Sequence, residues 1–145
     1  MELVLHRVCR GQRRELYALE ERPLPNENTK ENRPLEDFLN DLAEHDPDEH
    51  AKISRLLRFA ADHEPPRNKE KCRPVSDDFF EFKTGGGVRV LWFYDANRLI
   101  ICTHGFPKGQ EKRLAREVKH ALEWKKKYEA ARNARRIRFI EETIL

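Results

Sequence analysis

The sequence predicts a single α+β domain, spanning residues 1–145, in which a small antiparallel sheet packs against two N-terminal helices and one long C-terminal helix. Its 145 residues are the usual length of one domain with a modest core. Apolar residues recur at helical spacing between residues 34 and 65, and they alternate with polar residues from residue 79. Two very short connections then join consecutive strands, which requires antiparallel pairing.

The composition narrows the class of protein. Hydrophobic residues make up 38% of the chain, enough to fold, and charged residues make up another 38%. There is no run of eighteen apolar residues, and the first residues lack the basic-then-apolar layout of a secretion signal. Cys9, Cys72 and Cys102 are far apart and odd in number, which argues against a disulfide framework and fits a reducing compartment. We therefore expect a cytoplasmic protein.

The N-terminal third begins with a strand or hairpin. Residues 2–10 favour β-structure, and residues 13–21 can return as a second strand across Arg10-Gly11-Gln12. Residues 22–34 contain prolines and asparagines and have no apolar periodicity, so they predict a loop.

Two helices follow, and their starts are marked by capping residues. Pro34 suits the first turn of a helix, where its missing N–H costs little. Asp46 is a suitable N-cap for the second helix, with Pro47 at its first position and Glu49 completing a capping box. Pro65-Pro66 ends this helix. The two helices predict an antiparallel pair that covers the sheet, and nothing in their sequences indicates chemistry.

The second half predicts a three-stranded meander and a long helix. The strands are residues 79–84, 88–94 and 98–106, joined by Gly85-Gly86-Gly87 and by Asp95-Ala96-Asn97. Residues 111–131 form an amphipathic helix. The tail at 132–145 contains apolar residues that fit either a further strand or a short helix, and we expect it to dock on the body or on a partner.

Charge is unevenly distributed along the chain. Residues 1–78 carry 14 basic and 18 acidic side chains, whereas residues 79–145 carry 15 and 8. The surplus is densest at residues 107–138, with 12 basic and 4 acidic side chains. Such a surplus attracts polyanions, although a basic helix can also be a solvated face.

The turns predict which polar residues meet across the sheet. With Gly86 at the apex of its turn, Lys83 lies opposite Arg89, with Cβ atoms about 5 Å apart. If Asp95 pairs with Arg98, His104 lies opposite Arg89 and completes one row on one face. A connection of three residues in place of two would break the His104 match.

Two directly opposed cations are destabilising unless something compensates them. The side chains can splay into water, Glu81 can offset them, or they can form a seat for phosphate. The start of the last helix adds basic residues to the same end of the sheet, and helix N-termini favour anions. The third alternative therefore predicts a basic cleft between sheet and helix that binds a phosphate-bearing polyanion. Its candidate residues on the helix and before it are Lys108, Lys112, Arg113, Arg116 and Lys119.

The sequence identifies neither metal ligands nor a general acid or base. The histidines and cysteines show no metal-ligand spacing, so we expect neither a metal nor another cofactor. His104 titrates in a useful range for catalysis. A histidine between apolar strand residues is, however, also typical of a core position, so we assign no general acid or base.

An ordered set of short motifs carries a resemblance to a known family. The chain resembles the RelE/ParE superfamily of toxins from type II toxin–antitoxin systems, and within it the HigB-like, phage-associated branch. The similarity covers roughly residues 35–131. Its motifs are Phe80-Glu81-Phe82-Lys83, Gly85-Gly86-Gly87, Val88-Arg89-Val90-Leu91-Trp92 and His104-Gly105-Phe106-Pro107-Lys108, with Ala121 and Tyr128 in the helix.

The resemblance implies a metal-independent ribonuclease that cuts mRNA on the ribosome and is neutralised by an antitoxin, typically of the helix-turn-helix type. Arg89 corresponds to the arginine that holds the scissile phosphate, Lys83 to a basic strand residue, and Lys108 to the first lysine after His-Gly-Phe. The second lysine is Gly109 here, and no tyrosine stands at the start of the last helix.

Three functions are compatible with these observations. The first is a ribosome-dependent mRNA endonuclease toxin. The second is a ParE-like poison that inhibits a protein such as gyrase without cutting RNA. The third is a non-toxic phage RNA-binding protein of the same fold. The basic row of Lys83, Arg89 and Lys108 favours the first.

Overall fold

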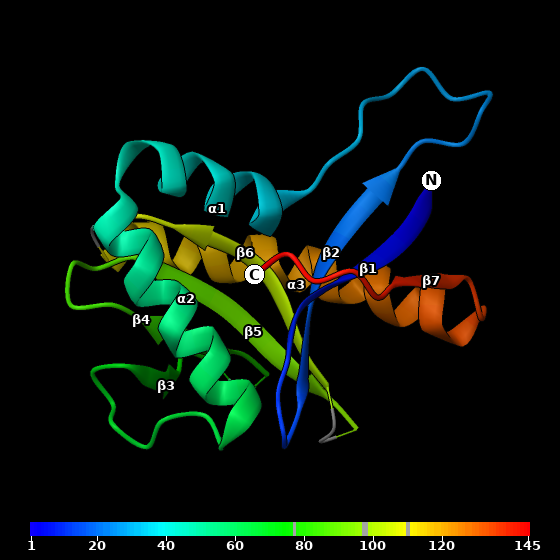
Figure 1. Ribbon diagram of the computed structural model, residues 1–145. Helices are drawn as coiled ribbons and strands as arrows, with labels where there is room; N and C mark the ends of the chain where they lie inside the picture. The colour runs from blue at the N-terminus through cyan, green and yellow to red at the C-terminus, as the bar shows by residue number, and fades with distance from the viewer. Residues whose placement is uncertain (77, 97–98, 110) are drawn as a thin grey trace.

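The computed structural model describes residues 1–76, 78–96, 99–109 and 111–145, and at residues 111 and 112 it describes only the backbone. It has a seven-stranded mixed sheet with strand order β3-β4-β5-β6-β2-β1-β7 (Figure 1). Helices α1 and α2 cover one face and α3 covers the other, which confirms the predicted α+β class. The elements are β1 (Glu2–Arg10), β2 (Glu15–Arg22), α1 (Pro34–His45), α2 (Pro47–Asp62), β3 (Cys72–Pro74), β4 (Phe80–Lys83), β5 (Arg89–Asp95), β6 (Leu99–Phe106), α3 (Glu111–Asn133) and β7 (Ile137–Ile140).

Strands β1 and β2 form the predicted N-terminal hairpin. Strand β2 joins the meander by pairing in parallel with β6, and the tail adds β7 in parallel to β1. The tail therefore takes the strand alternative, and it docks on the body. The amides of Ile144 and Leu145 donate to the carbonyls of Arg7 and Val8 at 2.9 and 3.0 Å. The short strand β3 is an element that the sequence did not predict.

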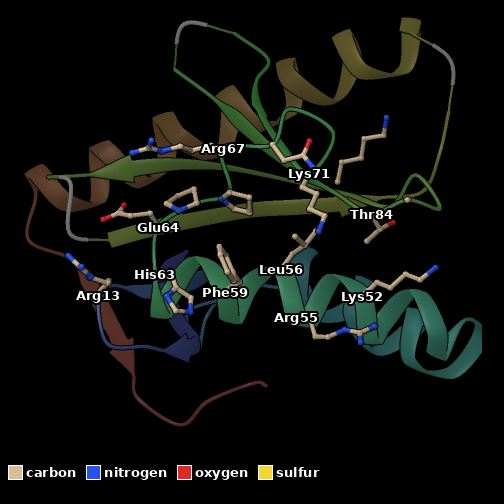
Figure 2. Close-up of a pocket in the computed structure, with 15 residues that line it drawn as sticks. Arg13, Lys52, Arg55, Leu56, Phe59, His63, Glu64, Arg67, Lys71 and Thr84 are labelled. Atoms are coloured by element: carbon tan, nitrogen blue, oxygen red, sulfur yellow. The ribbon is translucent and has the colours of Figure 1, made fainter.

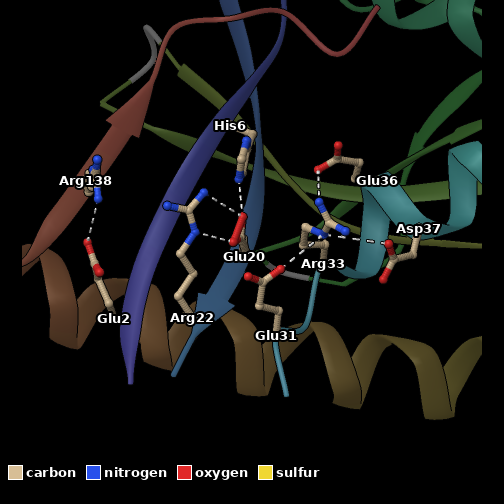
Figure 3. A network of polar contacts seen from close by, with 9 residues as sticks. All are labelled: Glu2, His6, Glu20, Arg22, Glu31, Arg33, Glu36, Asp37 and Arg138. Atoms are coloured by element: carbon tan, nitrogen blue, oxygen red, sulfur yellow. Dashed lines mark hydrogen bonds and ion pairs between the residues drawn. The ribbon is translucent and has the colours of Figure 1, made fainter. Parts of the chain in front are cut away.

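A polar network ties the hairpin to its neighbours (Figure 3). Glu20 is 1% exposed and accepts hydrogen bonds from Arg22 and His6. Burial would raise the pKa of the Glu20 carboxyl, but these two partners outweigh it and lower that pKa. Arg138 of β7 reaches Glu2 of β1 at 3.9 Å. The network therefore pairs charges of both signs along β1, β2 and β7.

Helix α2 begins as predicted, with one difference. The Asp46 carboxylate caps the helix by accepting from the Glu49 amide at 3.3 Å, and Pro47 occupies the first position. Glu49 does not close the predicted capping box. Its buried carboxylate instead accepts a hydrogen bond from the Thr84 hydroxyl at 2.5 Å, close to Gly86. The helix start is thereby tied to the β4–β5 turn.

The sheet has an apolar core on each face. Under α1 and α2 the core includes Leu39, Ile53, Leu57, Phe82 and Trp92. Under α3 it includes Leu91, Phe93, Ile101, Trp124 and Tyr128. All three cysteines are buried free thiols. Within the described residues, no helix is long and apolar enough to cross a membrane.

Register decides which side chains reach the α3 face. Lys83 pairs with Arg89, as predicted. The prediction that Arg89 faces His104 is wrong, because Asp95 pairs with Leu99 and a bulge shifts the register between Leu91 and Trp92. Arg89 faces Phe106, and His104 faces Leu91.

With the two-residue connection predicted from the sequence, Ile100 and Cys102 would share the face of Arg89, and Ile101 would lie on the other. The longer connection reverses these two faces. Ile101 lies in the α3 core, whereas Ile100 and Cys102 lie under α1 and α2. A shift of one residue exchanges the two faces of a strand. The bulge then inserts one extra residue at Thr103, which returns His104 to the α3 face.

Candidate nucleic-acid interface

Two cross-strand rows place the predicted site residues on the α3 face of the sheet. One row is Lys83 on β4, Arg89 on β5 and Phe106 on β6. The neighbouring row is Glu81, Leu91 and His104 on the same three strands. Lys83, Arg89 and His104 therefore share a face, but His104 lies one row away from the two cations.

Arg89 is held by a carboxylate that it shares with a second arginine. Its Nη1 atom lies 3.6 Å from Oε2 of Glu81, which is fully buried. The other oxygen of Glu81 accepts from Nε of Arg73 at 2.6 Å. Glu81 thus offsets the opposed cations, one of the alternatives open from the sequence. Two guanidinium groups on one carboxylate still leave one positive charge, and Lys83 adds another.

His104 lies beneath α3. It is 6% exposed, with Nε2 3.4 Å from Oε2 of Glu117 and its ring 5.1 Å from the ring of His120. Its Nδ1 is 3.1 Å from the Thr103 hydroxyl. Burial, aided by His120, lowers the pKa of His104 to about 4. His104 is therefore uncharged at neutral pH.

Lys108 lies directly on the β4–β5 turn. Gly87 has φ +90°, and a Cβ atom there would stand 2.7 Å from Cβ of Lys108. Only glycine combines that backbone conformation with this close approach. The turn that aligns Lys83 with Arg89 therefore also seats Lys108 close to that pair.

The space beside Gly109 is filled by a basic side chain. A Cβ atom on Gly109 would lie 2.5 Å from Cδ of Arg113, whose guanidinium stands 5.9 Å from the centre of the Phe106 ring. Arg113 is therefore next to the row that contains Arg89. Arg116 and Lys119 are exposed on α3, without ion pairs among the described residues. The side chain of Lys112 lies outside the described residues.

Several residues at this site were not predicted. Arg73 belongs to β3, which is too short to leave a sequence pattern. Glu117 and His120 approach His104 from α3. The helical spacing of Arg113, Glu117 and His120 places them on one side of α3, and this signal was available in the sequence.

Within the part of the chain that the structure describes, three buried polar atoms at the site make no hydrogen bond: Nε of Arg89, Oε2 of Glu81 and Nε2 of His104. The last two face an ion-pair partner, at 3.6 Å from Nη1 of Arg89 and at 3.4 Å from Oε2 of Glu117. Of these three atoms, Nε of Arg89 is the donor left without a partner. Buried donors are nearly always paired in folded proteins, so this one indicates a place where an anionic ligand can complete the bonding. Among the described residues, no group of His, Cys, Asp and Glu could hold a metal ion.

Comparison with known proteins gives one family. Residues 40–126, which run from α1 through most of α3 and include the whole site, match the phage-derived Gp49-like proteins (DUF891). The chain belongs to this Gp49-like family. The family is part of the RelE/ParE-like toxin–antitoxin superfamily. No protein with a curated description matches the chain.

The Gp49-like match locates the shared part of the fold. It covers α2, the meander of β4, β5 and β6, and the half of α3 that approaches His104. The hairpin of β1 and β2 and the tail strand β7 lie outside it. The candidate site therefore belongs entirely to the part of this chain that is common to Gp49-like proteins.

Proposed function

We propose that this Gp49-like protein is a HigB-like toxin, a ribosome-dependent and metal-independent mRNA endonuclease that arrests translation. The observation that carries the proposal is the position of Arg89. It lies between Lys83 and Phe106, with Nε unpaired and Lys108 on the adjoining turn. A fixed guanidinium with a free donor suits a phosphate oxygen.

The proposed chemistry needs orientation and charge more than a strong base. In metal-independent cleavage, the ribose 2′-OH attacks the adjacent phosphorus, a P–O bond forms, and the 5′-oxygen of the next nucleotide leaves. Negative charge builds on the phosphorane in the transition state. Arg89 would stabilise that charge, with Lys83 and Lys108 as secondary cations. Arg113 would supply the charge that relatives take from a lysine at position 109.

A second candidate is an RNA-binding protein of the same fold that does not cleave. The observation that favours it is the state of His104, which is buried and has a pKa of about 4. An uncharged imidazole cannot donate a proton as imidazolium at neutral pH, so the leaving oxygen would need another proton donor. A ParE-like poison would likewise not cut RNA, and it would act on a protein target.

The decisive experiment compares two arginines that share one carboxylate. The purified protein is added to a reconstituted translation system, and cleavage sites are mapped by primer extension. Arg89→Ala is expected to slow cleavage by about 10²–10³-fold, as for loss of one charge-stabilising donor. Arg73→Ala is the matched control, because it removes the other partner of Glu81. It is expected to lose far less activity than Arg89→Ala, because Arg73 approaches Glu81 from β3 and Arg89 keeps its place in the row with Lys83 and Phe106.

The outcomes separate the candidates. Equal losses in both variants would assign Arg89 a purely structural role. Arrested translation with uncut transcripts would reject the nuclease, and a supercoiling defect in the same cells would favour a ParE-like target. Binding of RNA with neither arrest nor cleavage would favour the accessory protein.

An antitoxin is the partner that the superfamily suggests. We propose that it neutralises the protein by laying an acidic segment over Arg89, Lys108 and Arg113. The ribosome-bound mRNA would then compete with the antitoxin for the same surface. Co-expression with the gene next to this one is expected to relieve arrest of translation, and failure of any neighbouring gene to do so would argue against the toxin.

A further inference from the structure

A second basic surface lies on the other side of the sheet, away from α3. It is a pocket of about 800 Å³ between α2, the loop that precedes β3, and the end of β4 (Figure 2). We call it the α2 pocket. Its volume is within the range of sites that hold small ligands. The sequence of α2 had indicated no chemistry, and the proposed cleavage site does not use this pocket.

Cations dominate the lining of the α2 pocket. Six basic side chains line it, against one carboxylate, Glu64, which is paired with Arg14 at 2.8 Å. Lys52 pairs with Glu49. The other five make no ion pair among the described residues. They are Arg13, Arg55, Arg67, Lys71 and Lys83.

The floor of the pocket is apolar and includes an exposed aromatic ring. Phe59 is 46% exposed, and its ring centre lies 4.7 Å from that of His63, one helical turn later. In Figure 2 the Phe59 ring points from α2 into the pocket, with Arg67 and Lys71 across from it. Leu56, Pro65 and Pro66 complete the apolar lining. The exposed ring and the cations around it therefore form one lining that is both apolar and positively charged.

We propose that the α2 pocket binds a nucleotide of single-stranded RNA, with the base stacked on Phe59 and the phosphates on Arg55, Arg67 and Lys71. Aromatic platforms combined with cationic grooves are how proteins hold single strands without reading sequence. A run of acidic residues alone would pair with the same cations but would leave the Phe59 ring uncovered. The chemistry therefore favours RNA.

The pocket and the Arg89 site share a border. Lys83, at the end of β4, borders the α2 pocket, and it pairs directly with Arg89, which lies on the α3 face. Because the two sites lie on opposite faces of the sheet, a strand with one phosphate at Arg89 would pass around the end of β4 at Lys83 to reach the pocket. This inference deepens the proposed function and rests on it for the choice of RNA as the ligand. The pocket would hold the substrate beyond the bond that is cut.

The test measures binding without cleavage. The probe is a fluorescein-labelled, single-stranded 2′-O-methyl oligonucleotide, in which the attacking hydroxyl is blocked, titrated with the full chain and followed by anisotropy. Arg67→Ala/Lys71→Ala is expected to weaken binding at least tenfold and to reduce the slope of log K against log salt by about 1.4, the value for two phosphate contacts. Phe59→Leu keeps an apolar side chain and removes the ring. It is expected to weaken binding roughly 5- to 150-fold.

A matched control carries the same loss of charge outside the pocket. Lys69→Ala/Lys126→Ala removes two exposed lysines, one from the same loop and one from α3, and neither lines the pocket. It is expected to keep the wild-type salt slope. Thermal unfolding of every variant should match the wild type, because the substituted side chains are exposed.

Three results would overturn the inference. Wild-type binding by Phe59→Leu would leave only a patch of charge, and equal losses in the pocket and control variants would show general electrostatic attraction. Tighter binding of a labelled hexaglutamate, lost in the same variants, would make the pocket a peptide site. Failure of the proposed function would appear in a different experiment, as uncut mRNA in the translation system. The titration does not depend on that result, because its oligonucleotide cannot be cleaved.

Discussion

The two basic surfaces of this protein hold their cations in opposite ways. On the α3 face, Arg89 is 15% exposed and lies against the buried carboxylate of Glu81. In the α2 pocket, Arg55, Arg67 and Lys71 are exposed and unpaired among the described residues. The first arrangement fixes a guanidinium in one position before any ligand arrives. The second leaves solvent-exposed charges that displace the counterions of a polyanion when it binds.

This difference assigns different work to the two surfaces. A charge held in a fixed position stabilises a transition state without reorganisation. The carboxylate that holds Arg89 in place also cancels part of the positive charge of this face. Free cations contribute affinity that depends strongly on salt, and they need no exact geometry. The α3 face is therefore suited to orienting one phosphate, and the α2 pocket to holding the strand.

The largest expected effect comes from leaving Glu81 without a partner. The double variant Arg73→Ala/Arg89→Ala strands a fully buried carboxylate, which should cost about 3–5 kcal/mol of unfolding free energy. Each single variant should cost much less, because the other arginine remains. The measurement is a double-mutant cycle by denaturant unfolding.

The α2 pocket supplies the contrast for that cycle. Arg67→Ala/Lys71→Ala also removes two cations, but neither has a buried partner, so it should change stability by no more than about 0.5 kcal/mol. Adding Glu81→Gln to the stranded variant should recover part of the loss, since the buried charge is then absent. Additive costs for Arg73 and Arg89 would show that Glu81 does not couple them.

The β4–β5 hairpin explains why part of the site could be predicted from the sequence. Gly85-Gly86-Gly87 is a short connection between two clear strands, so the pairing of Lys83 with Arg89 followed directly. The register predicted for the β5–β6 hairpin is wrong because its connection is one residue longer than expected and β6 contains a bulge. Neither leaves a distinct pattern in the sequence. The longer connection and the bulge each shift the register by one residue. Together they return His104 to the predicted face of the sheet, but opposite Leu91 and not opposite Arg89.

Long-range packing explains the rest. Arg73 reaches Glu81 only because three residues of β3 pair with β4, and no local pattern announces so short a strand. Phe59 and Arg55 occupy exposed positions of an amphipathic helix, where such residues are ordinarily solvated. They line a pocket because the chain between α2 and β3 folds back over them. That course depends on tertiary contacts.

His104 gives the next largest effect, and it is a dependence on pH. The fold lowers the pKa of His104 to about 4 from 6.5, so the folded state favours the uncharged ring. As the pH falls from 6.5 to 4, the unfolded chain takes up a proton that the folded chain resists, and stability decreases. A shift of this size corresponds to up to roughly 3 kcal/mol. The measurement is the unfolding free energy at several pH values.

A variant without the ring isolates this contribution. His104→Asn should flatten the pH dependence between 6.5 and 4, while His45→Asn, at an exposed position, should keep the wild-type slope. Glu117, His120, Thr103 and Phe106 surround His104, and none of them is changed. An unchanged slope in His104→Asn would mean that another group carries the acid sensitivity.

The smallest expected effect is at the start of α2, the helix that carries one wall of the pocket. Asp46 caps this helix through the Glu49 amide, so Asp46→Ala should cost about 1 kcal/mol. Asp46→Asn keeps an acceptor oxygen and should cost less. The pocket residues Arg55 to His63 lie in later turns, which the buried Ile53, Leu57 and Ala60 hold against the sheet. Oligonucleotide binding by Asp46→Ala should therefore equal that of the wild type at temperatures where the protein is folded. Weaker binding by fully folded Asp46→Ala would show that the pocket depends on the start of α2. The cations of the α2 pocket would then be fixed in position, as Arg89 is on the α3 face.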